Sequence, residues 1–215
     1  MKIIAINGSP RGEKSNTGVM IDAILKGLNA PGNKIENIYL TSKNIKYCTG
    51  CYSCWIKTPG KCIINDDMKN IIEQMAGADL IIFGSPLYFN NISGTLKVFF
   101  DRMTAAGGDP HKKTNIQTPG AALKFIMVSN CGFAHRSQFD AVSLWIKNVS
   151  KLMHANLIGE FYTANGRALT QPSNDQLKSR IAYLQFLESC GRQYLEYDVL
   201  DAAQKALLAG GVLDF

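Results

Sequence analysis

Apolar and polar residues follow one another along the chain in blocks that predict strands and helices in turn. Continuous apolar runs at residues 2–7, 79–84 and 121–129 are typical of strands buried on both faces of a parallel sheet. The alternating segment at 35–40 predicts a strand nearer the edge of the sheet, and residues 156–161 predict a further strand. This pattern indicates one sheet built from strands that are far apart in the sequence.

Between these strands, apolar residues recur at helical spacing. The predicted helices cover residues 17–28, 66–75, 93–102 and 138–153, with one or two more over 172–208. Ser15 or Asn16 is a suitable N-cap for the first helix, and Asp66 and Asp67 place carboxylates at the positive end of the second. Strands that alternate with helices predict an α/β fold with a parallel sheet and helices on both faces.

We expect a single domain over residues 1–215, with a cysteine-rich loop at 45–65 and a helical C-terminal extension from about residue 172. The chain is 46% apolar, which is enough for a full core. Its net charge of +6 comes from scattered basic residues, so we expect no nucleic-acid partner. No export signal or membrane span is legible, and we expect a cytoplasmic protein with no membrane partner.

The segment after the first strand predicts a phosphate-binding loop. Its small residues allow backbone N–H groups to approach an anion, and the helix that follows adds partial positive charge. The side chains suited to complete the site are Ser9, Arg11, Ser15, Asn16 and Thr17. Glu13 and Pro10 stand where the P-loop and the dinucleotide motif each need a glycine, which excludes both patterns. An ordinary strand-to-helix turn with a capping serine remains the alternative.

The segment after the third strand predicts a site for a planar ring. Aromatic residues beside proline and asparagine are unusual in a plain connection, and they suit an apolar wall with amide hydrogen bonds. The residues concerned are Pro86, Leu87, Tyr88, Phe89, Asn90 and Asn91. The alternative is that Leu87, Tyr88 and Phe89 cover the next helix as part of the core.

Cys48, Cys51, Cys54 and Cys62 form the most distinctive chemical motif in the chain. Closely spaced thiolates on a glycine-containing loop can converge on one iron–sulfur cluster or metal ion. Zinc is a second reading, although its ligand pairs are usually farther apart. Free thiols or a labile disulfide, forming a redox-sensitive loop, are a third.

Three motifs together resemble a known family. GSPR…SNT follows the first strand, GSPLYFNNISGTLKVFFDR follows the third, and the cysteine motif lies between them. Over about residues 1–160 the chain resembles the NADPH-dependent FMN reductase and iron–sulfur flavoprotein branch of the flavodoxin-like superfamily. The resemblance implies a flavodoxin-like three-layer sandwich with a five-stranded parallel sheet in the order 2-1-3-4-5.

The resemblance also implies how FMN would bind. The loop Ser9–Thr17 would hold the phosphate, and Pro86–Asn91 would flank the isoalloxazine ring. The other side of the ring would face Ser129, Asn130, Cys131 and Gly132. The cysteines would bind a 4Fe-4S cluster in the iron–sulfur branch, and members commonly form homodimers or homotetramers.

These observations predict an FMN-dependent oxidoreductase that passes electrons from NAD(P)H or a protein donor to a small acceptor such as a quinone, a flavin or a carrier. No residue pattern predicts a catalytic side chain, and flavin chemistry does not require one. Two alternatives stay open. One is an electron carrier that uses FMN and a cluster without turning over small molecules, and the other is a thiol-based redox sensor.

Overall fold

A computed structural model of the protein describes residues 1–107 and 123–197. Its centre is a five-stranded parallel sheet in the order β2-β1-β3-β4-β5. The strands are β1 (Lys2–Asn7), β2 (Lys34–Tyr39), β3 (Leu80–Pro86), β4 (Lys124–Asn130) and β5 (Asn156–Thr163). The predicted flavodoxin-like fold and strand order are therefore confirmed, and the strand order reverses between β1 and β3.

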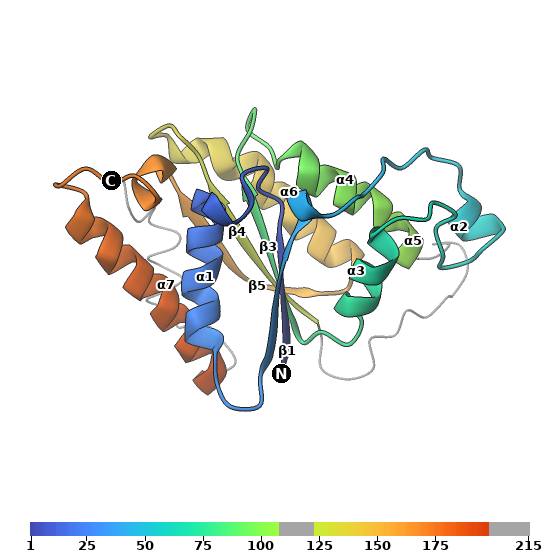
Figure 1. Ribbon diagram of the computed structural model, residues 1–215, viewed down its shortest axis with the longest axis horizontal. Helices are drawn as coiled ribbons and strands as arrows, with labels where there is room; N and C mark the ends of the chain where they lie inside the picture. Colours follow the sequence, from blue (N-terminus) through green and yellow to red (C-terminus); the bar gives the residue numbers. More distant parts are fainter. Residues whose placement is uncertain (108–122, 198–215) are drawn as a thin grey trace.

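Helices cover both faces of the sheet (Figure 1). They are α1 (Asn16–Leu28), α2 (Ser53–Ile56), α3 (Met68–Met75), α4 (Gly94–Arg102), α5 (Thr104–Gly107), α6 (Asp140–Leu152) and α7 (Leu177–Tyr197). Ile3 and Ala5 of β1 point into a core shared with α1 and α7. Ile4 and Ile6 point into the opposite core, which contains side chains of α3, α4 and α6. Because successive strand residues face opposite sides, an unbroken apolar run is required to fill both cores.

The predicted C-terminal helical segment begins later than expected, at Leu177, and packs along α1. Residues 198–215, and with them the end of the predicted segment, lie outside the described residues. The contact between α1 and α7 is close at two glycines: a Cβ atom on Gly27 would lie 2.0 Å from the carbonyl oxygen of Glu188, and one on Gly191 would lie 2.5 Å from that of Ile24. The absence of side chains at these positions lets the two backbones meet.

Element boundaries differ from the prediction by a few residues. Strand β3 continues through Ser85 and Pro86, and α3 begins at Met68, after both acidic residues. The start of the predicted fourth strand, residues 121 and 122, lies outside the described residues. These shifts matter at two places, since they extend β3 into the candidate ring site and free Asp66 and Asp67 for long-range contacts.

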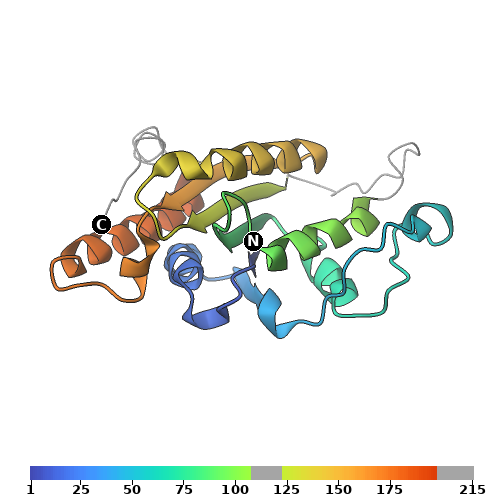
Figure 2. The ribbon, with the colours of Figure 1, turned by 90° about the horizontal axis from the view of Figure 1, so that it is seen from above.

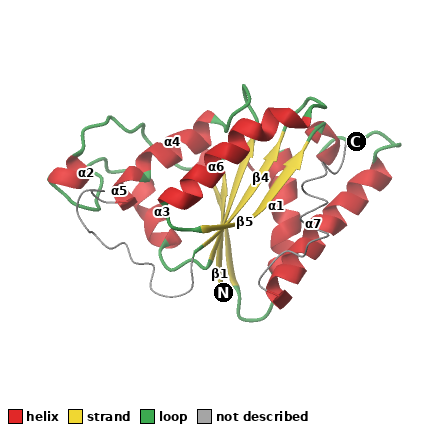
Figure 3. Cartoon of the chain, turned by 180° about the vertical axis from the view of Figure 1, so that it is seen from behind, coloured by secondary structure: helices red, strands yellow, loops and turns green. Residues whose placement is uncertain are grey.

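The cysteine-rich loop leaves the sheet after β2 and returns at α3. Figure 2 shows this loop and α2 at one end of the molecule and α7 at the other, and the same arrangement is visible from behind in Figure 3. Within the described ranges, no helix combines the length and the apolar character needed to cross a bilayer.

Candidate functional site

The loops that follow β1, β3 and β4 meet at the carboxyl edge of the sheet. The Gly8 N–H donates to the Gly84 carbonyl at 2.8 Å, and the Ser93 hydroxyl donates to the Gly8 carbonyl at 2.6 Å. The Leu87 N–H donates to the Asn130 carbonyl at 2.8 Å, which joins the third loop to the fourth. The segments expected to hold a phosphate and a ring thus lie at the same rim.

The first loop ends in an open helix N-terminus. The Ser15 hydroxyl caps α1 by accepting from the Gly18 N–H at 2.9 Å and donates to the Gly12 carbonyl at 2.6 Å. The N–H groups of Asn16 and Thr17 in the first turn find no acceptor among the described residues. Together with the helix dipole, these two donors favour an anion at this position.

Two buried polar groups at the strand ends also lack a partner in the described part of the chain. They are the amide nitrogen of Asn7, the last residue of β1, and the Ser129 hydroxyl, near the end of β4. Both residues are fully buried, and a buried polar group without a hydrogen bond is unfavourable. A ligand with several oxygen and nitrogen atoms would satisfy such groups, so the rim fits FMN in this respect.

The remaining residues predicted for the phosphate site occupy different positions at the rim. Ser9 is buried, with its N–H donating to the Asn7 side chain, whereas Arg11 is exposed. The Thr17 hydroxyl accepts from the Asn130 amide at 2.8 Å, and Asn16 accepts from the Thr170 hydroxyl at 2.6 Å. Ser15 therefore shapes the loop as a cap, while Arg11 is free of buried contacts and able to turn toward an anion.

The third loop presents aromatic rings at the rim. Tyr88 and Asn91 pair through their backbones at 2.9 and 3.1 Å, which closes a tight turn. Phe89 and Asn90 at its tip have φ values of 48° and 57°, a left-handed conformation that is uncommon for such residues. Phe89 is fully exposed and Tyr88 is half-exposed, so neither ring is core, whereas Leu87 packs against the core as the alternative reading expected.

The fourth loop lies beside the third. Cys131 is buried and its thiol donates to the Phe133 carbonyl at 3.1 Å, while burial raises the pKa of this thiol. Gly132 is exposed, and a Cβ atom there would meet nothing within 4 Å. Cys131 therefore supports the backbone of the loop, and Gly132 leaves open space next to the rim.

Three residues at this rim were not among the predicted site residues: Asn7, Ser93 and Thr170. Asn7 and Ser93 had a local signal, since each stands where a strand ends or a helix begins. Thr170 had none, because it reaches Asn16 from a position 154 residues away in the sequence.

Three cysteines of the loop affect the pKa of the fourth, Cys54. Burial raises the pKa of Cys54, and the charges of Cys62, Cys51 and Cys48 raise it further. Cys51 is exposed, and hydrogen bonds involving Ser53 and Thr49 lower the pKa of its thiol. No group of three or more His, Cys, Asp or Glu side chains in residues 1–107 and 123–197 is already arranged to hold a metal ion. The donor set has the chemistry of a cluster site, and its assignment as ligands stays a prediction.

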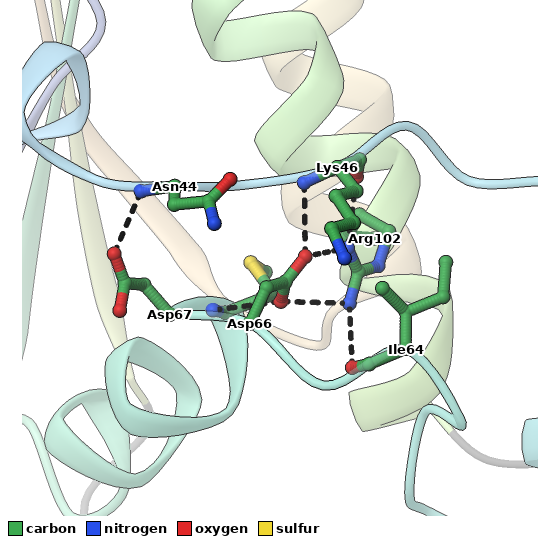
Figure 4. A network of polar contacts seen from close by, with 7 residues as sticks. Asn44, Lys46, Ile64, Asp66, Asp67 and Arg102 are labelled. Carbon is green, nitrogen blue, oxygen red and sulfur yellow. Dashed lines mark hydrogen bonds and ion pairs between the residues drawn. The ribbon is translucent and has the colours of Figure 1, made fainter.

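A buried ion pair closes the base of the cysteine-rich loop (Figure 4). The Arg102 guanidinium at the end of α4 donates to the Asp66 carboxylate at 2.6 and 3.1 Å. The same carboxylate accepts the Lys46 N–H at 2.9 Å, and Asp67 accepts the Asn44 N–H at 2.6 Å. Arg102 thus belongs to the interior of this chain, although it carries a full charge.

This ion pair predicts a loss of stability in acid. Burial raises the pKa of Asp66, but hydrogen bonds with Arg102, Lys46 and Met68 outweigh it and hold the pKa below its ordinary value. A carboxyl whose pKa is lowered by folding stabilises the protein above its unfolded pKa of about 3.9 and loses that contribution as the pH falls through the folded pKa. Urea unfolding of Asp66→Asn from pH 2.5 to 7 should show a flatter profile than the unmodified protein. Asp175→Asn, at an exposed position, should retain the original profile; equal profiles for all three proteins would contradict the prediction.

Comparison with known proteins agrees with this geometry. The sequence profile of the NADPH-dependent FMN reductase family matches residues 1–166. An iron–sulfur flavoprotein of Archaeoglobus fulgidus is 40% identical over 113 residues, which cover 53% of this chain and 50% of that protein. One from Methanocaldococcus jannaschii is 43% identical over 102 residues, which cover 47% and 51%. The chain therefore spans about half the length of the curated relatives it matches.

Among solved structures, an FMN-dependent NADH-azoreductase from Bacillus anthracis, in complex with FMN, superposes with a TM-score of 0.64 at 14% identity. The match covers 90% of this chain and 99% of that one. At this identity the likeness shows the fold alone. The family rests on the profile, which covers most of the chain and both rim loops, and it confirms the family predicted from the motifs. This chain belongs to the NADPH-dependent FMN reductase family.

Proposed function

We propose that this protein is an FMN-dependent oxidoreductase that takes electrons from NAD(P)H or a protein donor and delivers them to a small acceptor such as a quinone, a flavin or another carrier. One observation carries the proposal. The carboxyl edge of the sheet brings together the free N–H groups of Asn16 and Thr17 at the start of α1, the unpaired polar atoms of Asn7 and Ser129 at the ends of β1 and β4, and the exposed ring of Phe89 on the loop after β3.

In this proposal the chain's own residues bind and orient the cofactor. The N-terminus of α1 holds the phosphate, with Ser9 and Arg11 beside it, while Pro86–Asn91 and Ser129–Gly132 receive the ring. When bound, FMN supplies the hydride and electron chemistry, which needs no acid or base from the protein. The tasks left to the residues are to fix the ring, to direct backbone N–H groups at it and to restrict the access of water.

Titration of the apoprotein with FMN, followed by quenching of flavin fluorescence, tests binding. Stopped-flow absorbance under anaerobic conditions then tests whether NADPH or NADH reduces the bound flavin, with a quinone and free FMN as acceptors. We expect stoichiometric uptake and reduction by at least one nicotinamide. Absence of FMN uptake by folded protein would overturn the proposal.

The exposed aromatic ring at the tip of the third loop provides a sharper test. Phe89 makes no buried contact in the described structure, so Phe89→Ala should leave the free energy of unfolding unchanged. If the ring covers the flavin, FMN affinity should fall about fivefold, or ~1 kcal/mol, which is the usual value of an aromatic contact. Tyr47→Ala removes another exposed aromatic ring, on the cysteine-rich loop, and should leave FMN affinity unchanged. Equal affinities in both variants would remove Phe89 from the site.

A second candidate function is electron transfer through FMN and an iron–sulfur cluster, without turnover of small molecules. It is favoured by the four closely spaced free cysteines of one loop, a donor set with the chemistry of a cluster site. Curated relatives named iron–sulfur flavoproteins give it further support. Cys48, Cys51, Cys54 and Cys62 would be the ligands, and a cluster supplies one-electron chemistry when bound.

Iron and sulfide analysis of anaerobically purified protein, together with its absorption spectrum, separates these functions. About four iron atoms per chain would support the cluster. Zinc, or no metal, with rapid NAD(P)H oxidation would favour the plain reductase. A thiol-based sensor is supported only if oxidation of the cysteines changes partner binding in protein without flavin.

We also propose a cytoplasmic homodimer or homotetramer that binds no nucleic acid. Ligand cysteines require a reducing compartment, and exposed aromatic residues such as Phe89 and Phe133 at the rim suit coverage by a second subunit. Light scattering after size exclusion measures the assembly directly. A monomer at micromolar concentration would contradict this part of the proposal.

A further inference from the structure

Arg102 is a buried cation at the carboxyl end of α4. The other end of this helix contacts the candidate flavin site. Its side chain is only 1% exposed, and that of its partner Asp66 is fully buried. Removal of a guanidinium from water is costly, and a buried ion pair often contributes little net stability. A gain in net stability therefore does not account for a charged residue at this position.

The contacts of Arg102 join both ends of the cysteine-rich loop. One terminal nitrogen donates to the Lys46 carbonyl at 2.8 Å, just before the first cysteine, and to Asp66 at 2.6 Å. The other donates to Asp66 at 3.1 Å and lies 3.5 Å from the carbonyl of Ile64, just after the last cysteine. Figure 4 shows the guanidinium between the segment at Lys46 and the segment at Ile64. The planar fork fixes the separation of the loop ends, which a lysine ammonium would not do.

One donor of this guanidinium remains unused. The Arg102 Nε–H is buried and has no hydrogen-bond partner among the described residues. Burial lowers the pKa of Arg102, while the hydrogen bond with Asp66 and the charge of Cys62 more than restore it. Arg102 thus contacts the chain at Ile64, two residues after Cys62, and it retains a free buried donor.

We propose that Arg102 is a positioning residue of the cysteine site, which holds Cys62 in place as a ligand and sets a fixed positive charge at the base of the loop that would bind the cluster. This inference rests on the second candidate function, in which the four cysteines bind a cluster.

The charge of Arg102 has a direct consequence for the cluster. Four thiolates make a bound cluster anionic, and reduction adds one more negative charge. Net charge and hydrogen bonds to the sulfur atoms are main determinants of a cluster's reduction potential. A buried cation at the base of the loop would stabilise the reduced form of a bound cluster more than its oxidised form, and so would raise its reduction potential. Loss of the cation should therefore move the potential to more negative values.

Two variants separate the effect of the positive charge of Arg102 from the effect of its planar guanidinium. Arg102→Gln removes the charge, and Arg102→Lys keeps the charge but loses the planar fork. Lys69→Gln is the matched control, because it removes one positive charge from an exposed position on α3, close to Asp66 in the sequence. Each protein is reconstituted anaerobically with iron and sulfide. Iron per chain, the midpoint potential from a spectroelectrochemical titration, and FMN affinity as a check on the fold are then measured.

We expect Lys69→Gln to match the unmodified protein in all three measurements. Arg102→Gln should shift the midpoint potential to more negative values, and Arg102→Lys should keep the potential closer to the original while iron content falls at least about twofold, since the loop ends are no longer fixed. Both variants should keep FMN affinity. If Arg102→Gln fails to fold, the iron content of Arg102→Lys alone tests the inference.

Unchanged iron content and potential in a folded Arg102 variant would overturn the inference while leaving the cluster proposal intact. Failure of the unmodified protein to take up iron would overturn both, and retention of FMN binding in that case would leave the flavin proposal standing.

Discussion

Replacement of Gly8 by alanine is expected to weaken FMN binding by about tenfold or more, equivalent to ~1.4 kcal/mol. A Cβ atom at Gly8 would lie 2.5 Å from the Cβ of Leu96 and 3.2 Å from the Gly84 carbonyl. Leu96 is fully buried in the core, so the first turn of α4 must move outward. That movement would break the hydrogen bond from the Ser93 hydroxyl to the Gly8 carbonyl. The loop after β1, proposed to hold the phosphate, would then move apart from the loop after β3, proposed to receive the ring. Fluorescence titration with FMN measures the effect.

Gly94→Ala is the matched control for this prediction. Gly94 begins the same helix, is exposed, and has open space where a Cβ would project. Its substitution should leave both stability and FMN affinity near the original values. If Gly8→Ala binds FMN as tightly as Gly94→Ala, the close approach of α4 to the first loop does not determine the site.

Replacement of Gly27 by alanine is expected to lower the free energy of unfolding by about 3 kcal/mol. The new Cβ would lie 2.0 Å from the Glu188 carbonyl oxygen and 3.0 Å from the Arg192 nitrogen. These are backbone atoms of α7, so no rotamer change relieves the clash and the two helices must move apart. Alanine's higher helix propensity, worth about 1 kcal/mol, would offset only part of that cost. Urea denaturation monitored by circular dichroism gives the value.

The free energy of unfolding of Gly27→Ala is compared with that of Gly94→Ala, which adds a methyl group to a helix without a clash. A loss of stability shared by both variants would point to a general effect of the substitution. A loss confined to Gly27→Ala would show that α7 is part of the cooperative fold, as its buried residues Tyr183, Leu187 and Tyr194 indicate.

Helix α4 connects the two candidate sites. Its N-cap residue, Ser93, bonds the first loop at the flavin rim, and its last residue, Arg102, holds the base of the cysteine-rich loop. One helix therefore carries a contact to each candidate site. The variants of Gly8 and Arg102 therefore probe opposite ends of one element, and the expected retention of FMN affinity in the Arg102 variants would show that the two ends act independently.

The pattern of apolar residues was sufficient to predict a parallel sheet and the edge at which the candidate flavin site lies. The buried runs in β1, β3 and β4 can fill two cores only in the middle of a parallel sheet, and the carboxyl ends of parallel strands share one edge. Loops that follow such strands must then lie near one another, whatever their sequence separation. This is why the sequence alone places Ser9–Thr17 and Pro86–Asn91 at the same edge of the sheet.

Long-range partners were decided only by the tertiary structure. The sequence predicted Asp66 as a charge favouring the start of a helix, but it could not show that Arg102, 36 residues later, would be buried against it. Thr170 reaches Asn16, and Gly27 meets Glu188 of α7, through contacts that no local pattern encodes. Periodicity specifies which face of an element is buried, because that depends on neighbours a few residues away. Which side chains that face contacts depends on how distant elements pack. In this protein that packing forms the ion pair of Asp66 and Arg102 at the base of the cysteine-rich loop.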